Sequence, residues 1–279
     1  MTADASSKWG DLLVRTASAV VLIPAVIACV WVGGELFVGF TALLGCLIAH
    51  EWTRIVHAGS GPQYALHVAA ALSGCLITQY GGAGPAIAMI VALAVASALL
   101  VRFGDRPRSP WSYLGIFYVG LPVMALVILR QDPVEGFAAI MWVFLIVWGA
   151  DILAYFAGRI IGGPRLAPRI SPKKTWAGLA GAIVGSALAS LIFAHFRGLN
   201  GWPALVFLAA GLALVEQGGD LFESAVKRYY GVKDSGHIIP GHGGIIDRVD
   251  GLIAVVIIAG LIGWSRDQGL GAAHGLLLW

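Results

Sequence analysis

Long apolar segments alternate with short polar stretches along almost the whole chain. Each segment has close to the ~20 residues that a helix needs to cross the hydrocarbon core of a bilayer. We therefore predict an all-α fold, a polytopic integral membrane protein with about nine transmembrane helices in a single domain. The expected spans are 14–33, 35–52, 64–80, 84–101, 112–130, 136–158, 176–195, 202–222 and 251–266.

The composition supports a membrane protein and indicates its orientation. Hydrophobic residues make up 58% of the chain and charged residues 12%, whereas soluble domains carry about a quarter. An odd number of spans puts the two termini on opposite sides. Of the 18 lysines and arginines, all but Arg130, Arg197 and Arg266 then lie on the side of the N-terminus. The positive-inside rule makes that side cytoplasmic, and we expect a bacterial plasma (inner) membrane.

The main exception to the apolar pattern is the stretch 224–250, SAVKRYYGVKDSGHIIPGHGGIIDRVD, between the last two expected spans. Charged groups beside a bilayer core are costly, so their concentration there indicates a functional site. The cytoplasmic loops also lengthen toward the C-terminus. We therefore expect residues 136–279 to carry the catalytic helices and loops, and about 1–135 to form a helical scaffold.

The expected helix that leads into this stretch carries a row of acidic residues on one face. Glu216, Asp220, Glu223 and Lys227 follow one another at offsets of 0, 4, 7 and 11, which places them on one face of a helix. Such a stripe fits a proton relay, a metal site or internal ion pairing, and the spacing alone does not choose among them.

Asp247 narrows the choice, because it lies just before the last span and the chain can fold back to place it beside Asp220. Two carboxylates from neighbouring helix ends suit Mg²⁺ that holds phosphates. The glycines on either side of His242 permit a tight loop whose N–H groups could face an anion. Asp250 and Arg248 could add to this site or form a local ion pair at the start of the last helix.

A second basic segment, 159–175, follows an aspartate within a span, Asp151. Its density of cations fits binding of phosphate or anionic headgroups, although such a cluster can also serve only to orient the protein. Pro172 fixes the backbone ahead of Lys173 and Lys174, and Thr175 can cap the following helix. This order favours a binding role.

At these positions the chain resembles phosphatidate cytidylyltransferases, also called CDP-diacylglycerol synthases. The residues that match the C-terminal signature of this family are Ser224, Lys227, Arg228, Lys233, Asp234, Pro240, Gly241, His242, Gly243, Gly244, Asp247, Arg248 and Asp250. A second block begins at Asp151 and ends with SPKKTW, and Glu51–Trp52 and YVGLP at 118–122 are also similar. One departure is Ala177, where the family usually has Glu.

The resemblance implies the reaction of CTP with phosphatidate to give CDP-diacylglycerol and pyrophosphate, with Mg²⁺ as cofactor and the identity of a second cation open. The implied catalytic residues are Asp220, Asp247, Lys227, Arg228 and Lys174. The implied substrate-binding residues are Ser171, Lys173, Lys174, Lys233, His242, Gly243, Gly244 and Arg248. The implied metal ligands are Asp220 and Asp247, with Asp250 and Asp151 as further candidates.

Two other functions remain to be separated from this one. A CTP-dependent polyprenol or phytol kinase would also need CTP and a metal, but it would transfer the terminal phosphoryl group to an alcohol. A cation-coupled transporter would use the acidic stripe, and the concentration of charge in cytoplasmic loops disfavours it. The expected partners are CTP, phosphatidate and the lipid bilayer, with no nucleic acid, and the resemblance implies a homodimer.

Overall fold

The computed structural model describes residues 3–103, 111–239 and 243–279. Its elements are α1 (Ala3–Val32), α2 (Gly34–Val56), α3 (Gly61–Leu72), the π-helical turn η1 (Ser73–Ile77), α4 (Thr78–Gly81), α5 (Ala83–Phe103), α6 (Trp111–Arg130), α7 (Gly136–Ile160), β1 (Arg165–Ala167), β2 (Ser171–Thr175), α8 (Trp176–Arg197), α9 (Trp202–Tyr229), α10 (Ile246–Ser265) and α11 (Ala272–Leu277).

Each of the nine predicted spans coincides with helical structure, and the helical fold is confirmed. Within the described residues, six helices are long and apolar enough to cross a membrane, namely α2, α5, α6, α7, α8 and α9. The other three predicted spans are less regular. α1 has only a short apolar part, Val20–Val32, the third span is interrupted by η1, and α10 begins with charged residues. The chain is an integral membrane protein with multiple candidate spans.

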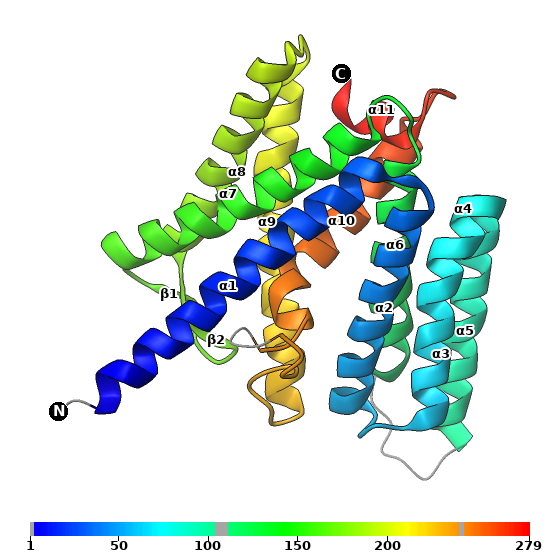
Figure 1. The fold of residues 1–279 in the computed structure, drawn as a ribbon, viewed down its shortest axis with the longest axis horizontal. Coiled ribbons are helices and arrows are strands. Elements are labelled where there is room, and N and C mark those ends of the chain that lie inside the picture. Colours follow the sequence, from blue (N-terminus) through cyan, green and yellow to red (C-terminus); the bar gives the residue numbers. More distant parts are fainter. Residues whose placement is uncertain (1–2, 104–110, 240–242) are drawn as a thin grey trace.

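The connections between helices gather at two opposite ends of the bundle (Figure 1). The N-terminus, the α2–α3 turn, the β1–β2 hairpin and the α9–α10 connection lie at the lower end of the view. The C-terminus and α11 lie at the upper end. The ends of the described chain on opposite sides agree with an odd number of passes, and the β1–β2 hairpin and the α9–α10 connection share one end as predicted.

Glycine allows α7 and α8 to lie unusually close. A Cβ on Gly185 would stand 2.0 Å from the carbonyl oxygen of Gly149, and a Cβ on Gly181 would stand 2.5 Å from that of Leu153. Small residues at such interfaces let helix backbones approach in lipid. The Ser186 hydroxyl also donates a hydrogen bond of 2.8 Å to the Ile146 carbonyl. The α7–α8 pair is therefore a close-packed support for the loops at its lower end.

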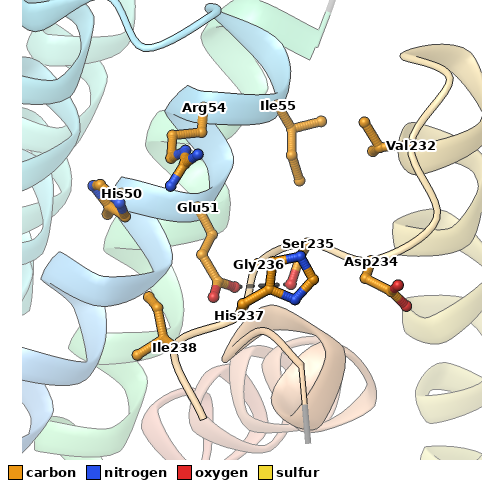
Figure 2. A pocket seen from close by; sticks show the side chains of 10 residues that line it. All are labelled: His50, Glu51, Arg54, Ile55, Val232, Asp234, Ser235, Gly236, His237 and Ile238. Carbon is orange, nitrogen blue, oxygen red and sulfur yellow. Dashed lines mark hydrogen bonds between the residues drawn. The ribbon is translucent and has the colours of Figure 1, made fainter. Parts of the chain in front are cut away.

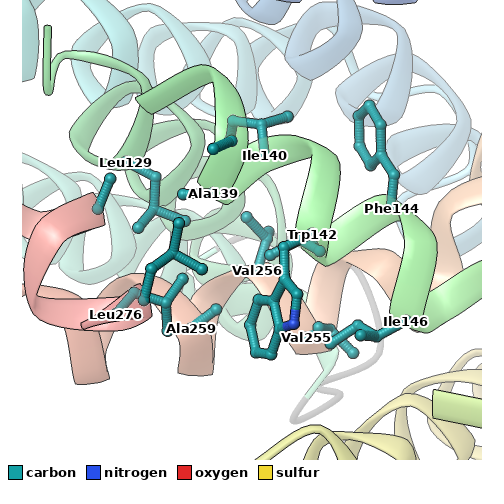
Figure 3. Packing of buried hydrophobic residues seen from close by; sticks show 14 of the residues in the cluster. Leu129, Ala139, Ile140, Trp142, Phe144, Ile146, Val255, Val256, Ala259 and Leu276 are labelled. Atoms are coloured by element: carbon teal, nitrogen blue, oxygen red, sulfur yellow. The ribbon is translucent and has the colours of Figure 1, made fainter. Parts of the chain in front are cut away.

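A hydrophobic core joins this pair to the rest of the bundle (Figure 3). Trp142 of α7 is fully buried against the face of α10 that carries Val255 and Val256. Its indole N–H donates to the Ser190 hydroxyl of α8 at 3.0 Å, so the polar edge of the ring is satisfied. Leu276 of α11 packs into the same cluster. The core thus fixes α7, α8 and α10 relative to one another.

One local feature differs from the prediction. Residues 165–175 form a small antiparallel hairpin, β1–β2, in a segment expected to be a loop of an all-α protein. α9 continues beyond its expected membrane span to Tyr229, so the acidic stripe and Lys227 lie on one helix, as predicted. Glu223 and Lys227 therefore stand on a rigid helix, and the predicted cap is confirmed because Thr175 Oγ1 accepts from the Gly178 N–H at 3.0 Å.

Candidate active site

A cavity of about 550 Å³ lies where the hairpin meets α7, α8 and α9. Its charged lining combines two aspartates, Asp151 and Asp220, with three cations, Arg159, Lys173 and Lys174. The volume falls within the range of ~300–1,000 Å³ that is typical of small-molecule sites. Opposed charges in a cavity of this size suit a ligand that carries phosphates and a counter-ion.

Lys174 links the hairpin to α9 inside this cavity. Its ammonium group lies 2.7 Å from Asp220 Oδ2 and donates to Gln217 Oε1 at 3.0 Å. The Gln217 amide in turn donates to Glu216 Oε2 at 2.8 Å. Lys174 was predicted to meet a phosphate, but in the structure its partner is a carboxylate, so a phosphate would have to compete with Asp220 for it.

Two further carboxylates approach Asp220 from neighbouring helices. Asp151 of α7 interacts electrostatically with Asp220 and with Lys174. Asp250 of α10 interacts with Asp220 and Asp151. One oxygen of Asp250 accepts the Gly251 N–H at 2.9 Å. Three helices therefore bring acidic groups toward one region, with a lysine as their nearest cation.

Asp247 has a different set of partners. Its Oδ1 lies 2.7 Å from the Lys227 ammonium, and its Oδ2 accepts the N–H groups of Ser235 at 3.0 Å and Gly244 at 3.1 Å. Lys227 also pairs with Glu223 at 2.7 Å. Burial acts to raise the pKa of Asp247, but Lys227 and the two N–H groups outweigh it and hold the pKa below its ordinary value.

The glycine loop does present an N–H group to an anion, as predicted, but the anion in the structure is Asp247 itself. Gly243 has φ +84°, a conformation that glycine adopts readily, and this bend aims the Gly244 N–H at the carboxylate. His242 lies outside the described residues, as do Pro240 and Gly241.

The remaining predicted residues lie at varied distances from the cavity. Lys173 lines it, and Ser171 begins the strand that carries both lysines. Arg248 interacts electrostatically with Asp151. Arg228 is exposed and donates to the Val232 carbonyl at 3.1 Å. Lys233 is exposed as well and is not part of this cavity's lining.

Among the described residues, no three acidic, histidine or cysteine side chains are gathered closely enough to hold a metal ion by themselves. Mg²⁺ commonly takes one or two carboxylates and completes its shell with water and substrate phosphates. Asp220 opens to the cavity and has other carboxylates near it, so the residues present fit that mode of binding.

Gln217, which was not predicted, connects Lys174 to Glu216. Arg159 and Tyr155, which belong to the block that resembles the family, lie on the cavity wall, where Arg159 donates to the Tyr155 hydroxyl at 2.6 Å. Tyr118 of α6 is buried, its hydroxyl has no hydrogen-bond partner among the described residues, and it interacts electrostatically with Asp250 and other site carboxylates. Gln217 could have been noticed in the sequence, because a glutamine beside Glu216 within an expected membrane span is a polar residue that needs a partner.

A cavity lined by cations and carboxylates at one end of a membrane bundle defines an enzyme that handles phosphates at a bilayer surface. The chain belongs to the cytidylyltransferase family, whose profile matches residues 13–265. A protein named phosphatidate cytidylyltransferase from Brucella abortus biovar 1 (strain 9-941) is 38% identical over 255 residues, 91% of this chain and 93% of its own length.

Shorter matches cover about half of the chain. A phosphatidate cytidylyltransferase of Haemophilus influenzae is 39% identical over 151 residues, 52% of each chain. One of Rickettsia bellii is 39% identical over 158 residues, 53% of this chain and 68% of its own length. The family that the motifs indicated is thereby confirmed.

Proposed function

We propose that this chain is a phosphatidate cytidylyltransferase, which converts CTP and phosphatidate to CDP-diacylglycerol and pyrophosphate. The observation that carries this proposal is the cavity of about 550 Å³, where Arg159, Lys173 and Lys174 face Asp151 and Asp220 at one end of a membrane bundle. The near full-length similarity to proteins of that name supports the same reaction.

The reaction requires positioning and charge neutralisation more than covalent help from the protein. An oxygen of the phosphatidate phosphate attacks the α-phosphorus of CTP, the bond to the β-phosphate bridging oxygen breaks, and pyrophosphate leaves. Lys173 and Arg159 extend from the cavity wall toward phosphate groups. When the substrate enters, the Lys174 ammonium group leaves Asp220 and neutralises a phosphate of the substrate instead.

The other predicted residues act around this centre. Lys227 and the Gly243–Gly244 backbone hold Asp247 in place, and Arg248 adds positive charge on the side of Asp151. Ser171, Lys233, Arg228 and His242 stay predictions as substrate-binding or catalytic residues.

Mg²⁺ would neutralise negative charge on the phosphates of CTP. Asp220 would hold it, with Asp247 as the second ligand and Asp250 and Asp151 as further candidates. The electrostatic interactions among Asp151, Asp220 and Asp250 support a site formed by these three carboxylates, as does the preference of Mg²⁺ for carboxylate oxygens. Asp247 as a ligand stays a prediction. Asp247 would contribute an oxygen that now faces Lys227.

The lipid substrate explains why the site lies at a bundle end. Phosphatidate has its phosphate at headgroup level and its acyl chains in the bilayer, so a site there reaches the phosphate without extracting the lipid. The distribution of basic residues supports a cytoplasmic site and N-terminus in a bacterial inner membrane. A homodimer stays a prediction from the resemblance.

Labelled CTP tests the proposal directly. Purified protein in detergent is given phosphatidate, Mg²⁺ and CTP labelled either in the cytidine or in the γ-phosphate. We expect cytidine label in the lipid fraction and γ-label in pyrophosphate. Label from the γ-phosphate on a polyprenol, with release of CDP, would identify the kinase instead. Ion flux in vesicles without any product would identify a transporter.

A further inference from the structure

A buried glutamate of the N-terminal half reaches across the molecule to the loop that precedes Asp247. Glu51 of α2 is only 1% exposed. Its Oε2 accepts hydrogen bonds from the Ser235 hydroxyl at 2.8 Å and the Ile246 N–H at 2.9 Å. Its Oε1 accepts the Ile245 N–H at 2.8 Å. Figure 2 shows Glu51 pointing from its helix toward Ser235.

The loop is shaped to receive this side chain. A Cβ on Gly236 would stand 2.5 Å from Glu51 Oε1, and a Cβ on Gly244 would stand 2.7 Å from Oε2. Any other residue at either position would have to displace the carboxylate. Two glycines and three hydrogen-bond donors therefore surround one buried side chain from a distant part of the sequence.

Ser235 connects Glu51 to Asp247. Its hydroxyl donates to Glu51, while its own N–H donates to Asp247 Oδ2 at 3.0 Å. Gly244, which also donates to Asp247, lies directly before the two residues whose N–H groups meet Glu51. The two carboxylates thus hold the same short loop from opposite sides.

Charge also suits the arrangement. Ile245 is the N-cap of α10 and Ile246 its first residue, so Glu51 accepts N–H groups that have no partner within the helix. A negative charge near a helix N-terminus is favourable. A glutamine of the same shape would turn an N–H₂ group toward a backbone N–H, whichever way its amide lies, and would lose at least one of these bonds.

We propose that Glu51 is a positioning residue for the transferase reaction. It fixes Ser235, Ile245 and Ile246 against α2, and it thereby keeps the Ser235 and Gly244 N–H groups on Asp247. This inference rests on the proposed function for its catalytic consequence, whereas the clamp itself is a structural statement that can be tested separately.

The test compares Glu51→Gln with Glu35→Gln. Glu35 lies on the same helix but at its other end, where it accepts a hydrogen bond from the exposed Tyr80 hydroxyl at 2.8 Å. Hydrogen–deuterium exchange without CTP or Mg²⁺ should show faster exchange of residues 235–246 in Glu51→Gln, with α7 and α8 unchanged. Glu35→Gln should match the wild type.

Kinetic measurements then distinguish a positioning role of Glu51 from a loss of folded protein. Loss of a group that orients a metal ligand typically costs roughly 10- to 100-fold in activity or metal affinity. We expect Glu51→Gln to lower kcat in that range or to raise the Mg²⁺ concentration for half-maximal rate. A change in Mg²⁺ dependence is informative because a smaller folded fraction would leave it unaltered. Ser235→Ala, which removes one of the three bonds, should change both readouts less in the same direction.

Three outcomes would overturn the inference. They are wild-type exchange of residues 235–246 in Glu51→Gln, faster exchange spread over the whole protein, and a locally loosened loop with unchanged kcat and Mg²⁺ dependence. A wild-type protein that makes no CDP-diacylglycerol would refute the proposed function instead, and the exchange experiment would still decide whether the clamp exists.

Discussion

Asp220 and Asp247 have the same side chain, but they occupy opposite kinds of environment. The Asp220 side chain is 31% exposed, lines the cavity and pairs with the Lys174 ammonium group. The Asp247 side chain is 10% exposed and accepts from Lys227 and from two backbone N–H groups. One carboxylate can exchange its partner, whereas the other is held by several at once.

This difference indicates separate tasks. A lysine side chain can leave Asp220 when a ligand with phosphates enters, because neither group depends on the other for its place in the fold. Asp247 holds Ser235 and Gly244 through their backbone N–H groups, so its removal would disturb structure as well as chemistry. The two residues had been predicted as equivalent ligands, and the structure gives a way to distinguish them.

The largest effect is expected for Asp220→Asn. It removes a negative charge from the cavity without removing any hydrogen bond from the backbone. Loss of a group that stabilises charge in the transition state costs roughly 10²- to 10³-fold, and kcat for CDP-diacylglycerol formation should fall by at least that factor. The apparent melting temperature should stay at the wild-type value. Near-normal turnover across a Mg²⁺ titration would contradict the role assigned to Asp220.

Asp247→Asn should affect both activity and local order. An amide at this position points its N–H₂ group at Lys227 or at a backbone N–H, so buried donors lose a partner at about 1–3 kcal/mol. We expect a fall in kcat and faster hydrogen exchange of residues 235–244. If this variant lost activity with no change in exchange, the contrast with Asp220 would disappear.

Much of the fold was accessible from the sequence because lipid restricts the choice. Apolar segments of about 20 residues must satisfy their backbone internally, which makes them helices. The π-helical turn at Ser73–Ile77 was not predictable, since nothing in an apolar segment marks a local change of hydrogen bonding. The β1–β2 hairpin was missed because its strands have only three and five residues and its apolar positions do not alternate.

The sequence named candidate site residues, but it did not predict which of these side chains pair with one another. Spacing placed Asp220 and Lys227 on one face of a helix, and the structure agrees. Which lysine meets which carboxylate depends on how α8, α9 and α10 pack, and that is not encoded in local spacing. Glu51 was noted only for its resemblance, because no neighbour in the sequence shows that it faces residues about 190 positions away.

Lys174→Met tests whether the cation that pairs with Asp220 also binds a substrate phosphate. Methionine keeps much of the length of the side chain but loses the ammonium group that contacts Asp220 and Gln217. We expect kcat/KM for CTP or phosphatidate to fall roughly 10- to 100-fold, because one phosphate loses its counter-ion in a site with few cations. Arg102→Met, at an exposed position in the last turn of α5 and outside the proposed site, serves as the control for loss of one basic charge. Equal effects of both variants would indicate that the basic segment 159–175 serves only to orient the protein in the membrane.

The smallest effect is expected for Thr175→Ala, next to Lys174. Its hydroxyl caps α8 through the Gly178 N–H, and loss of such a cap typically costs about 1 kcal/mol. The melting temperature should fall slightly, and exchange should quicken in β2 and the first turn of α8, while residues 235–246 stay protected. Thr175→Ser keeps the hydroxyl and should behave as wild type. Because the hairpin carries Lys174 and the α9–α10 loop supports Asp247, loosening confined to the hairpin would show that the two carboxylates are held by independent parts of the fold. Loosening of both regions would show that they form one cooperative unit.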